Sequence, residues 1–192
     1  MGDLLSSHMD FLSHQKEPHR KIVEDYHALS EVVKGLRTVG YKIVATIGSW
    51  DLLHIGHVRY LRQARERGDV LIVGVDSDET VKRYKGEHRP VVPYVERCEM
   101  LTYQSGIDFI TQIHDLDEHG KWNYGLLKAI HPDVFVAVED SYPQEQIDEI
   151  KKYCGEVVVL PRQAENTSTT QMIQFAVKKN LDKMYEMINK RV

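Results

Sequence analysis

This chain has little cysteine and no long apolar run. Cys98 and Cys154 are the two cysteines among 192 residues, and their spacing supports neither a metal site nor a disulfide framework. No apolar stretch approaches the roughly 20 residues of a membrane-spanning helix, and the N-terminus lacks the apolar core of a secretory signal. We therefore expect a reduced, cytoplasmic protein with no membrane partner.

The chain also lacks a strong charge of either sign. Lys plus Arg total 25 and Asp plus Glu total 29, so the formal net charge is −4. A chain with this balance has no global attraction to nucleic acid, so we expect no nucleic-acid partner, and any phosphate site must be local. With 42% hydrophobic residues, the chain can bury the core of one compact domain.

Several common ligand motifs are missing. No Walker sequence G-x-x-x-x-G-K-[ST] occurs, which excludes a P-loop ATPase or kinase, and no G-x-G-x-x-G follows the first apolar run, which argues against the usual dinucleotide fold. No H-E-x-x-H helix or third ligand at useful spacing is present, so a zinc site is a poor hypothesis and we predict no protein-held metal. No nucleophilic Ser/His/Asp set is apparent either.

What the chain does have is a regular alternation of short apolar runs and amphipathic segments. The apolar runs predict strands at 42–48, 70–75, 107–111, 133–138 and 156–160. The amphipathic segments predict helices at 21–36, 56–67, 93–104, 121–130, 143–153 and from Ser168 to the end. This order predicts an α/β, Rossmann-like fold, with a parallel five-stranded sheet, helices on both faces, and N-terminal and C-terminal helical extensions.

We expect three parts along the chain: residues 1–18 as a flexible tail or tag remnant, 19–38 as an N-terminal helix, and 39–192 as the main domain. On the last helix, an apolar stripe recurs at helical spacing. Its members are Leu181, Met184, Tyr185 and Ile188. The stripe indicates either packing on the core or contact with a second copy in a homodimer.

The segment GSWDLLHIGH, from Gly48 to His57, is the strongest site signal. It follows a predicted strand and opens a helix, and helix N-termini attract anions through unpaired N–H groups and partial positive charge. His54 and His57 add side-chain donors, and Gly56 lets a ligand approach the backbone. Ligands of parallel sheets bind outside the carboxyl ends of the strands. We interpret the segment as a phosphate pocket; the alternative is a pair of structural histidines.

Two further segments carry anion-binding residue types. Lys85, Arg89 and Arg97 surround a loop marked by glycine and proline, and each can hold a phosphate by a charge-assisted hydrogen bond, or lie on an ordinary solvated loop. The run Asn166–Thr170 opens the last helix; one of its hydroxyls suffices as an N-cap, and the others predict a second anion cradle. Two cradles with flanking cations suit a nucleoside triphosphate better than a single phosphate.

These segments resemble the motifs of the cytidylyltransferase-like nucleotidyltransferases. GSWDLLHIGH resembles the first signature, KGEHRPVVPYVER the middle loop and NTSTTQMI the last, and the likeness covers Lys21 to Ile173. Within this superfamily the chain is most similar to the heptose 1-phosphate adenylyltransferase domain, through EVVKGLRTVGYKIV, RPV and STT. Glycerol-3-phosphate cytidylyltransferases share LPR and DLLH.

The resemblance implies a nucleotidyltransferase domain over 39–192 that moves a nucleoside monophosphate from a triphosphate, with ATP favoured, to a sugar phosphate such as heptose 1-phosphate. Mg²⁺ would accompany the nucleotide. The residues expected to be catalytic are His54, His57, Lys85 and Arg97. Those expected to bind nucleotide are Gly48, Ser49, Trp50, Gly56, Glu139, Ser168, Thr169 and Thr170. Those expected at the acceptor are Asp51, Arg89 and Asp140, although Asp51 also fits a turn that orients the loop.

Two other functions stay open at this point. A CTP-dependent cytidylyltransferase acting on glycerol 3-phosphate or a similar small phosphate requires only different substrates. A non-enzymatic module would bind nucleotide without transferring it, with the altered segment 137–140 as its mark. Pyrophosphate release separates an enzyme from such a module. A class I aminoacyl-tRNA synthetase shares the histidine pair, but this chain is short and acidic and has no KMSKS-like loop.

Overall fold

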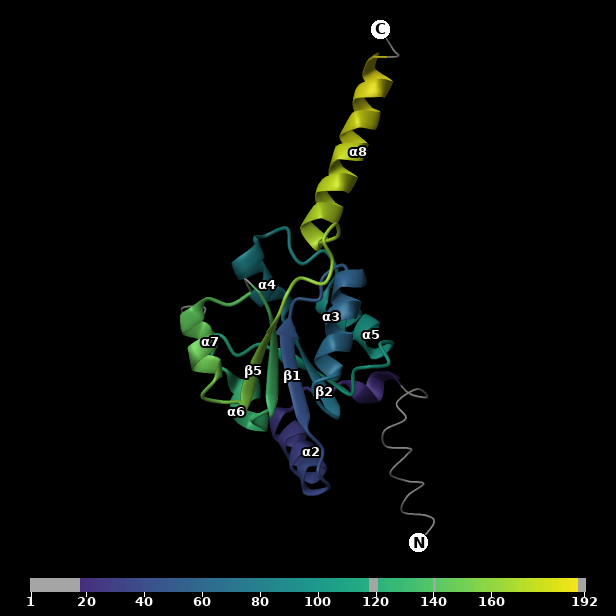
Figure 1. The fold of residues 1–192 in the computed structure, drawn as a ribbon. Helices are drawn as coiled ribbons and strands as arrows, with labels where there is room; N and C mark the ends of the chain where they lie inside the picture. The colour runs from purple at the N-terminus through teal and green to yellow at the C-terminus, as the bar shows by residue number, and fades with distance from the viewer. Residues whose placement is uncertain (1–17, 118–120, 140, 190–192) are drawn as a thin grey trace.

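A five-stranded parallel sheet forms the centre of the molecule. The computed structural model describes residues 18–117, 121–139 and 141–189, so the predicted tail lies outside the described residues except for its last position. The strand order is β3-β2-β1-β4-β5 (Figure 1). The strands are β1 Ile43–Gly48, β2 Val70–Asp76, β3 Phe109–Ile113, β4 Val134–Val138 and β5 Glu156–Leu160. All four pairings are parallel, which confirms the predicted Rossmann-like α/β fold.

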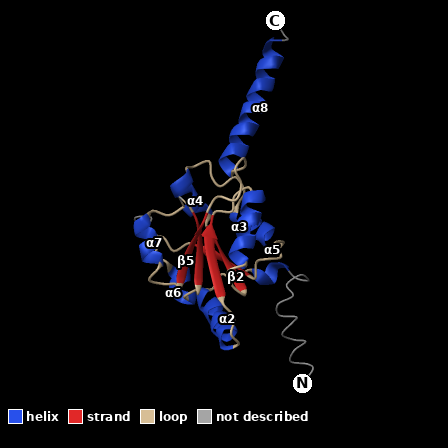
Figure 2. Cartoon of the chain, in the orientation of Figure 1, coloured by secondary structure: helices blue, strands red, loops and turns tan. Residues whose placement is uncertain are grey.

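Helices cover both faces of this sheet, as predicted (Figure 2). They are α2 Tyr26–Thr38, α3 Ile55–Arg65, α4 Asp78–Lys85, α5 Tyr94–Thr102, α6 Gly125–Ile130, α7 Gln144–Ile150 and α8 Thr169–Asn189, after a short 3₁₀ turn, η2 Pro18–Lys21. Leu29 of α2 and Leu127 of α6 pack in one buried cluster with Ala45. Leu61 of α3 packs in the other with Val44. Neighbouring β1 side chains enter opposite clusters, which explains why this strand is mostly apolar. Its buried polar residue, Thr46, bonds the Tyr60 hydroxyl at 2.7 Å.

The N-terminal helix begins later than predicted. Asp25 is its N-cap and accepts a hydrogen bond from the His27 backbone N–H at 2.8 Å. Ile22 instead forms an isolated parallel bridge with Ile110 of β3. An aspartate that caps a helix marks its first turn, so the prediction of helix from residue 21 is wrong by five positions.

Two other boundaries move for similar local reasons. β3 runs over Phe109–Ile113 rather than 107–111, because Ile107 belongs to a turn in which its N–H bonds the Gln104 carbonyl. α6 begins at Gly125 rather than 121. Trp122 pairs with Leu116 in an antiparallel bridge, and the next turn, at Tyr124, has a left-handed φ of 59°. Neither arrangement is helical, so the longer predicted helix is wrong.

Helix α4 was not predicted at all. It begins after Ser77, whose hydroxyl accepts a hydrogen bond from the Thr80 N–H at 3.1 Å. Asp78 and Glu79 occupy its first turn, where negative charge favours the helix dipole. The helix ends at Lys85, whose Nζ donates to the hydroxyl of Ser49, the residue that follows β1.

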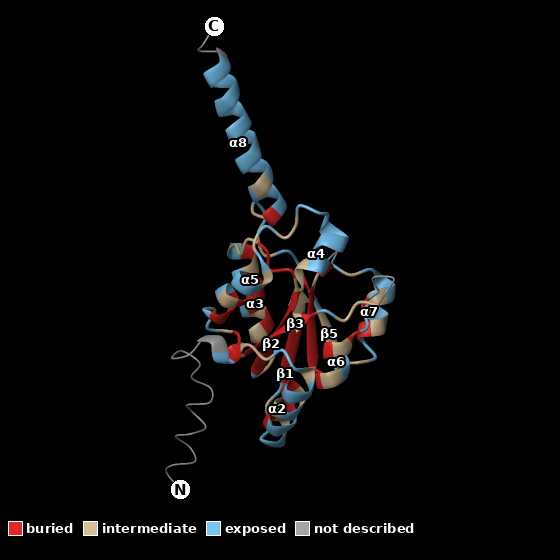
Figure 3. Ribbon diagram, turned by 180° about the vertical axis from the view of Figure 1, so that it is seen from behind, coloured by how far each residue is buried: buried red, intermediate tan, exposed pale blue. Residues whose placement is uncertain are grey.

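Helix α8 projects away from the body of the molecule (Figures 1 and 3). Along the predicted stripe Leu181 is 48% exposed, Met184 53%, Tyr185 67% and Ile188 59%. The interpretation that this stripe packs on the core is therefore wrong, and the dimer contact stays a prediction. No helix in the described part of the chain combines the length and the apolar character needed to cross a membrane.

Candidate active site

The loop between β1 and α3 carries most of the predicted site, and a buried tryptophan anchors it. Trp50 has a φ of 52° and is 5% exposed, and its Nε1 donates to the Gly74 carbonyl at 2.8 Å. Residues other than glycine seldom adopt positive φ, so the anchored indole stabilises an unusual turn. Gly48 makes room for it, because a Cβ there would lie 3.3 Å from the indole ring. Trp50 was predicted to bind nucleotide; it lines the cavity, but its N–H is bonded within the protein.

The two histidines form a reciprocal cap at the start of α3. His54 is the N-cap, and its Nδ1 accepts from the Gly56 N–H at 3.1 Å. The His57 Nδ1 accepts from the His54 backbone N–H at 3.4 Å. Serine and glutamate usually make this capping box. Here imidazoles take both positions, so the residues that complete the helix terminus also face the cavity.

Burial disfavours the charged form of both imidazoles. Burial lowers the pKa of His54, and burial with the neighbouring His54 and Lys85 lowers the pKa of His57 to about 3. A neutral imidazole has one N–H, and because each Nδ1 accepts, the hydrogen-bond pattern assigns the proton to Nε2. The pair therefore offers two Nε2–H donors at a helix N-terminus, which is suited to a phosphate.

Gly56 makes room for the histidine cap. A Cβ at Gly56 would lie 2.9 Å from His54 Cε1 and 3.1 Å from the Ala164 Cβ. Both distances are closer than side chains normally approach, so a larger residue would displace the imidazole. Gly56 was predicted to let a ligand approach the backbone. In the structure, the space that a Cβ at Gly56 would take is occupied by the His54 side chain.

The predicted cation Lys85 reaches this loop from the end of α4. Its Nζ donates to Ser49 Oγ at 2.7 Å, and both residues line the cavity. Burial lowers the pKa of Lys85, and the charge of Arg89 adds to the effect, while Asp76 and Asp51 oppose it. The Lys85 amino group and the Ser49 hydroxyl thus lie beside the histidine loop, where a phosphate is expected.

Asp51 holds this loop to the segment that follows α4. Its carboxylate, which has no exposed surface, accepts from Arg89 Nε at 2.7 Å and from the N–H groups of Val91 and Val92, each at 3.0 Å. Burial alone would raise the pKa of Asp51, but these hydrogen bonds hold it below its usual range. Asp51 was predicted either to contact the acceptor substrate or to orient the loop. Because its carboxylate is enclosed by these partners, the structure supports the second role. Arg89 is 12% exposed and lines the cavity.

Arg97 lies beneath the site. It is 1% exposed, and its guanidinium donates to the carbonyls of Ser49, Val92 and Asp76 and to the Asp78 carboxylate. These bonds join the β1 and β2 ends to α4 and α5, and they use four of the five guanidinium N–H donors. The structure therefore supports a positioning role for Arg97, and its contact with the triphosphate or the acceptor stays a prediction.

The hydroxyl run at the start of α8 meets the histidine loop. Thr169 is 9% exposed, and its Oγ1 donates to the Asp51 carbonyl at 2.8 Å across 118 positions of sequence. Ser168 accepts from the Gln171 N–H at 3.2 Å and so acts as a cap. Thr170 is exposed, and all three residues line the cavity. Two helix N-termini, those of α3 and α8, thus face the same space.

Glu139, the first residue of the acidic pair after β4, does not line this cavity. Glu139 is exposed, and its carboxylate accepts from the Arg162 N–H at 2.9 Å. Its contact with the nucleotide stays a prediction. Asp140 lies outside the described residues.

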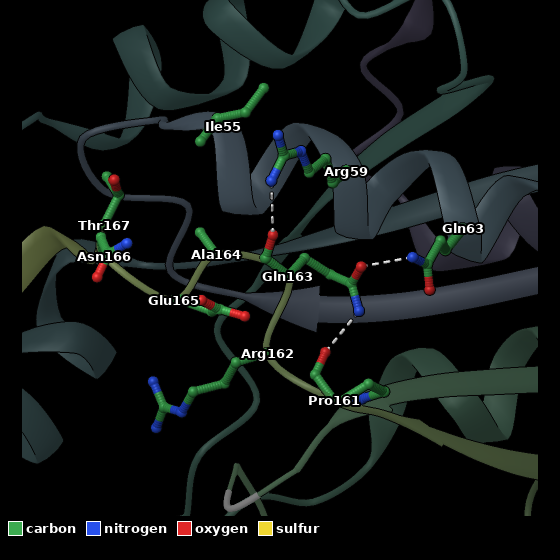
Figure 4. A pocket seen from close by; sticks show the side chains of 10 residues that line it. All are labelled: Ile55, Arg59, Gln63, Pro161, Arg162, Gln163, Ala164, Glu165, Asn166 and Thr167. Atoms are coloured by element: carbon green, nitrogen blue, oxygen red, sulfur yellow. Dashed lines mark hydrogen bonds between the residues drawn. The ribbon is translucent and has the colours of Figure 1, made fainter.

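The cavity itself runs along the carboxyl edge of the sheet and has a volume of about 1440 Å³. Of the predicted residues it is lined by Gly48, Ser49, Trp50, His54, Gly56, His57, Lys85, Arg89, Ser168, Thr169 and Thr170. Across the segment 161–167, which follows β5, lies a smaller depression of about 470 Å³ (Figure 4). There Arg59 of α3 donates to the Gln163 carbonyl at 3.3 Å and fastens this segment to the helix.

Four residues that were not predicted from the sequence form another wall of the cavity. They are Asp76, Tyr84, Trp122 and Tyr142. Asp76 is the last residue of β2, so the rule that ligands bind at the carboxyl ends of strands was a signal that could have found it. Tyr84 comes from α4, and Trp122 and Tyr142 come from the segments after β3 and β4. No spacing in the chain links these three aromatic residues.

Comparisons with known proteins agree with this geometry. Residues 45–182 match the Cytidylyltransferase-like family. The chain is 38% identical over 133 residues to the bifunctional protein HldE of Nitratiruptor sp., a match of 69% of this chain and 28% of that protein. It is 40% identical over 146 residues to the HldE of Pseudomonas paraeruginosa, with 74% and 29% covered. The chain thus spans less than a third of the length of these curated relatives.

Solved structures show the same fold at lower identity. A lipopolysaccharide core biosynthesis protein from Thermoplasma volcanium is 23% identical, with a TM-score of 0.55 over 65% of this chain and 100% of that one. The pantoate-beta-alanine ligase of Francisella tularensis is 16% identical, with a TM-score of 0.56 over 75% of this chain and 67% of its own. Given the family match over most of its length and the paired histidines and hydroxyls that meet in one cavity, the chain belongs to the cytidylyltransferase-like family of nucleotidyltransferases.

Proposed function

We propose that this chain transfers a nucleoside monophosphate from ATP to a sugar phosphate such as heptose 1-phosphate, with release of pyrophosphate. The proposal rests on the contact between Thr169 and the Asp51 carbonyl, because that contact puts the hydroxyls of α8 opposite the imidazoles of α3. The choice of ATP and of a heptose phosphate follows the sequence resemblance, with the HldE relatives as support.

In the proposed reaction, an oxygen of the acceptor phosphate attacks the α-phosphorus of the triphosphate. The bond from that phosphorus to the bridging oxygen breaks, and pyrophosphate carries away the electron pair. A phosphate monoester with a second pKa of about 6 is already largely ionised at pH 7, so no general base is required. The protein has to position the two phosphates and stabilise the charge that moves between them.

The lining residues fit these tasks. The Nε2–H groups of His54 and His57 would donate to the phosphates, and Lys85 would add a positive charge beside them. Ser168 and Thr170 would donate to the far end of the triphosphate, while Thr169 keeps its bond to the loop. These donors are N–H and O–H groups, so the oxygen ligands of a magnesium ion would come from the phosphates. The ion would screen their negative charge, as it does when it binds through substrate phosphates.

A matrix of the common triphosphates against sugar 1-phosphates and polyol phosphates, read out as pyrophosphate, tests the proposal. We expect the greatest release from ATP with heptose 1-phosphate. Greatest release from CTP with glycerol 3-phosphate would establish the cytidylyltransferase alternative. Binding of nucleotide without release from any pair would contradict transfer altogether, and calorimetric titration of each triphosphate supplies that measurement.

A further inference from the structure

The cavity is larger than one ligand needs. Its volume of about 1440 Å³ exceeds the roughly 300–1,000 Å³ of a pocket for one drug-sized ligand. The proposed triphosphate residues lie at the ends of β1 and β5 and at the starts of α3 and α8. Another part of the lining lies at the ends of β2 and β3, on α4 and in the loops after β3 and β4, and we call it the β2–β3 wall. It contains Asp76, Tyr84, Ile113, Leu116, Trp122 and Tyr142.

The centre of the β2–β3 wall is a carboxylate held by a tyrosine. Asp76 is 8% exposed, and its Oδ2 accepts from the Tyr84 hydroxyl at 2.6 Å. The Asp76 main-chain carbonyl is bonded to buried Arg97, so the residue is fixed at both backbone and side chain. A carboxylate has about four acceptor positions, and Tyr84 occupies one of them. The group is therefore oriented and retains capacity to accept a ligand O–H.

Aromatic rings line the same wall. The rings of Trp122 and Tyr142 are stacked with centroids 6.4 Å apart and an angle of 28° between their planes. The Tyr124 ring packs against the Trp122 ring with centroids 4.3 Å apart, and the Phe135 ring packs against Tyr142 with centroids 6.0 Å apart. These contacts make the rings a stiff apolar surface beside the Asp76 carboxylate.

This combination suits a neutral ring with several hydroxyl groups. A carboxylate in buried surroundings of low dielectric repels a phosphate but accepts hydrogen bonds from hydroxyl groups. An aromatic face packs against the C–H surface of a sugar ring. Two cations, Arg83 and Lys121, also line this end, and Arg83 is paired with Glu79 at 2.7 Å. The acceptor phosphate fits better at Lys85 and Arg89, where the two halves of the cavity join.

We infer that Asp76, oriented by Tyr84, is a specificity-determining residue that accepts a hydroxyl of the acceptor sugar while the sugar ring lies on Trp122 and Tyr142. The inference rests on the proposed function, because it assigns the other half of the cavity to the triphosphate. It goes beyond that function by naming the group that distinguishes a polyhydroxylated acceptor from a deoxygenated one.

Steady-state kinetics of Asp76→Asn and Tyr84→Phe test this role. Loss of a charge-assisted hydrogen bond should lower kcat/KM for the sugar phosphate about 10- to 100-fold, with the KM for the triphosphate within about twofold of wild type. The wild-type enzyme should also discriminate against acceptors that lack single hydroxyls, and Asp76→Asn should lose the discrimination for one of them. Glu99→Gln and Tyr103→Phe are matched controls, since Tyr103 is 64% exposed and bonds Glu99 at 3.2 Å on the surface of α5.

Two kinetic outcomes would overturn the inference. If Asp76→Asn raises the KM for the triphosphate, the β2–β3 wall binds the nucleotide base and not the acceptor sugar. If it changes the kinetic constants of neither substrate, the wall does not contribute to specificity. Circular dichroism identifies a variant that fails to fold, in which case Tyr84→Phe decides. If no pair of substrates releases pyrophosphate, the proposed function fails separately. Calorimetric titration with the same sugar phosphates then decides: binding that Asp76→Asn weakens supports the inference, and equal or absent binding contradicts it.

Discussion

The imidazole rings of His54 and His57 stack with centroids 3.9 Å apart and an angle of 25° between their planes. Each Nδ1 accepts a backbone N–H at the start of α3, so the stack belongs to the helix cap. The Trp50 ring packs edge-on against His57, with ring centroids 5.7 Å apart and an angle of 67° between their planes. The pair is therefore rigid before any ligand arrives, which is what electrostatic stabilisation of a moving charge requires.

We predict that His57→Ala lowers the rate of pyrophosphate release about 10²- to 10³-fold, by analogy with removal of one oxyanion-hole donor. The circular dichroism spectrum should remain that of wild type. His27→Ala, an exposed position on α2, is the control and should keep full activity. Near-normal release by His57→Ala would show that this imidazole does not contact the reacting phosphates.

A second prediction concerns stability at acidic pH. The pKa of His57 is lowered to about 3 by burial, whereas its ordinary value is 6.5. Between these values the unfolded chain binds a proton that the folded one excludes, so the contribution of His57 is complete above pH 6.5 and is lost as the pH falls toward 3. His57→Gln cannot titrate and should lose less free energy of unfolding on acidification. Urea unfolding of both proteins from pH 7 to pH 4 measures the difference, and parallel curves would contradict a lowered pKa.

The buried position of Arg97 predicts a stability effect. Arg97→Met would leave the carbonyls of Ser49, Val92 and Asp76 without their donor. At about 1–3 kcal/mol for each unsatisfied buried group, the free energy of unfolding should fall by at least ~3 kcal/mol. Arg62→Met is the control, because its side chain is 83% exposed and such surface pairs contribute little, about 0–1 kcal/mol. If Arg97→Met kept the stability of the wild type but raised the KM for the triphosphate, Arg97 would be shown to contact the substrate.

Exposure of α8 makes a further prediction. Leu181 is 48% exposed, so at low protein concentration Leu181→Ala should cost less than about 0.5 kcal/mol of unfolding free energy. Leu127→Ala, at a fully buried position of α6, should cost about 2–5 kcal/mol. Chemical denaturation at several concentrations provides the test. An unfolding midpoint that rises with concentration in the wild type, and does not in Leu181→Ala, would support the homodimer predicted from the apolar stripe.

Local patterns explain which elements could be predicted. The five apolar runs became five strands, because strands of a parallel sheet covered on both faces are rich in apolar residues. β5 keeps its predicted bounds. Helix α4 was missed although Ser77 followed by Asp78 and Glu79 is a helix-start signal. The apolar stripe of that helix is short, so periodicity alone did not reveal it.

Charged side chains show where such patterns stop. Lys85, Arg89 and Arg97 looked alike in the sequence, yet Lys85 and Arg89 line the cavity and Arg97 lies under it. A charged side chain pairs with whatever the fold brings near it, and those partners here come from distant positions. The same reason accounts for Glu139, which bonds the Arg162 N–H 23 positions away.

The order of residues by itself determined the sheet, the two helix starts that face its carboxyl edge, and the family. These depend on spacing within one strand or one helical turn, which is written in adjacent positions. Only the tertiary structure decided that Asp51 and Arg97 hold the loop, that α8 stands free, and that Asp76 meets Tyr84, Trp122 and Tyr142 on one wall. Such meetings depend on crossover connections and on burial, because the free energy of a polar contact is set by the groups around it.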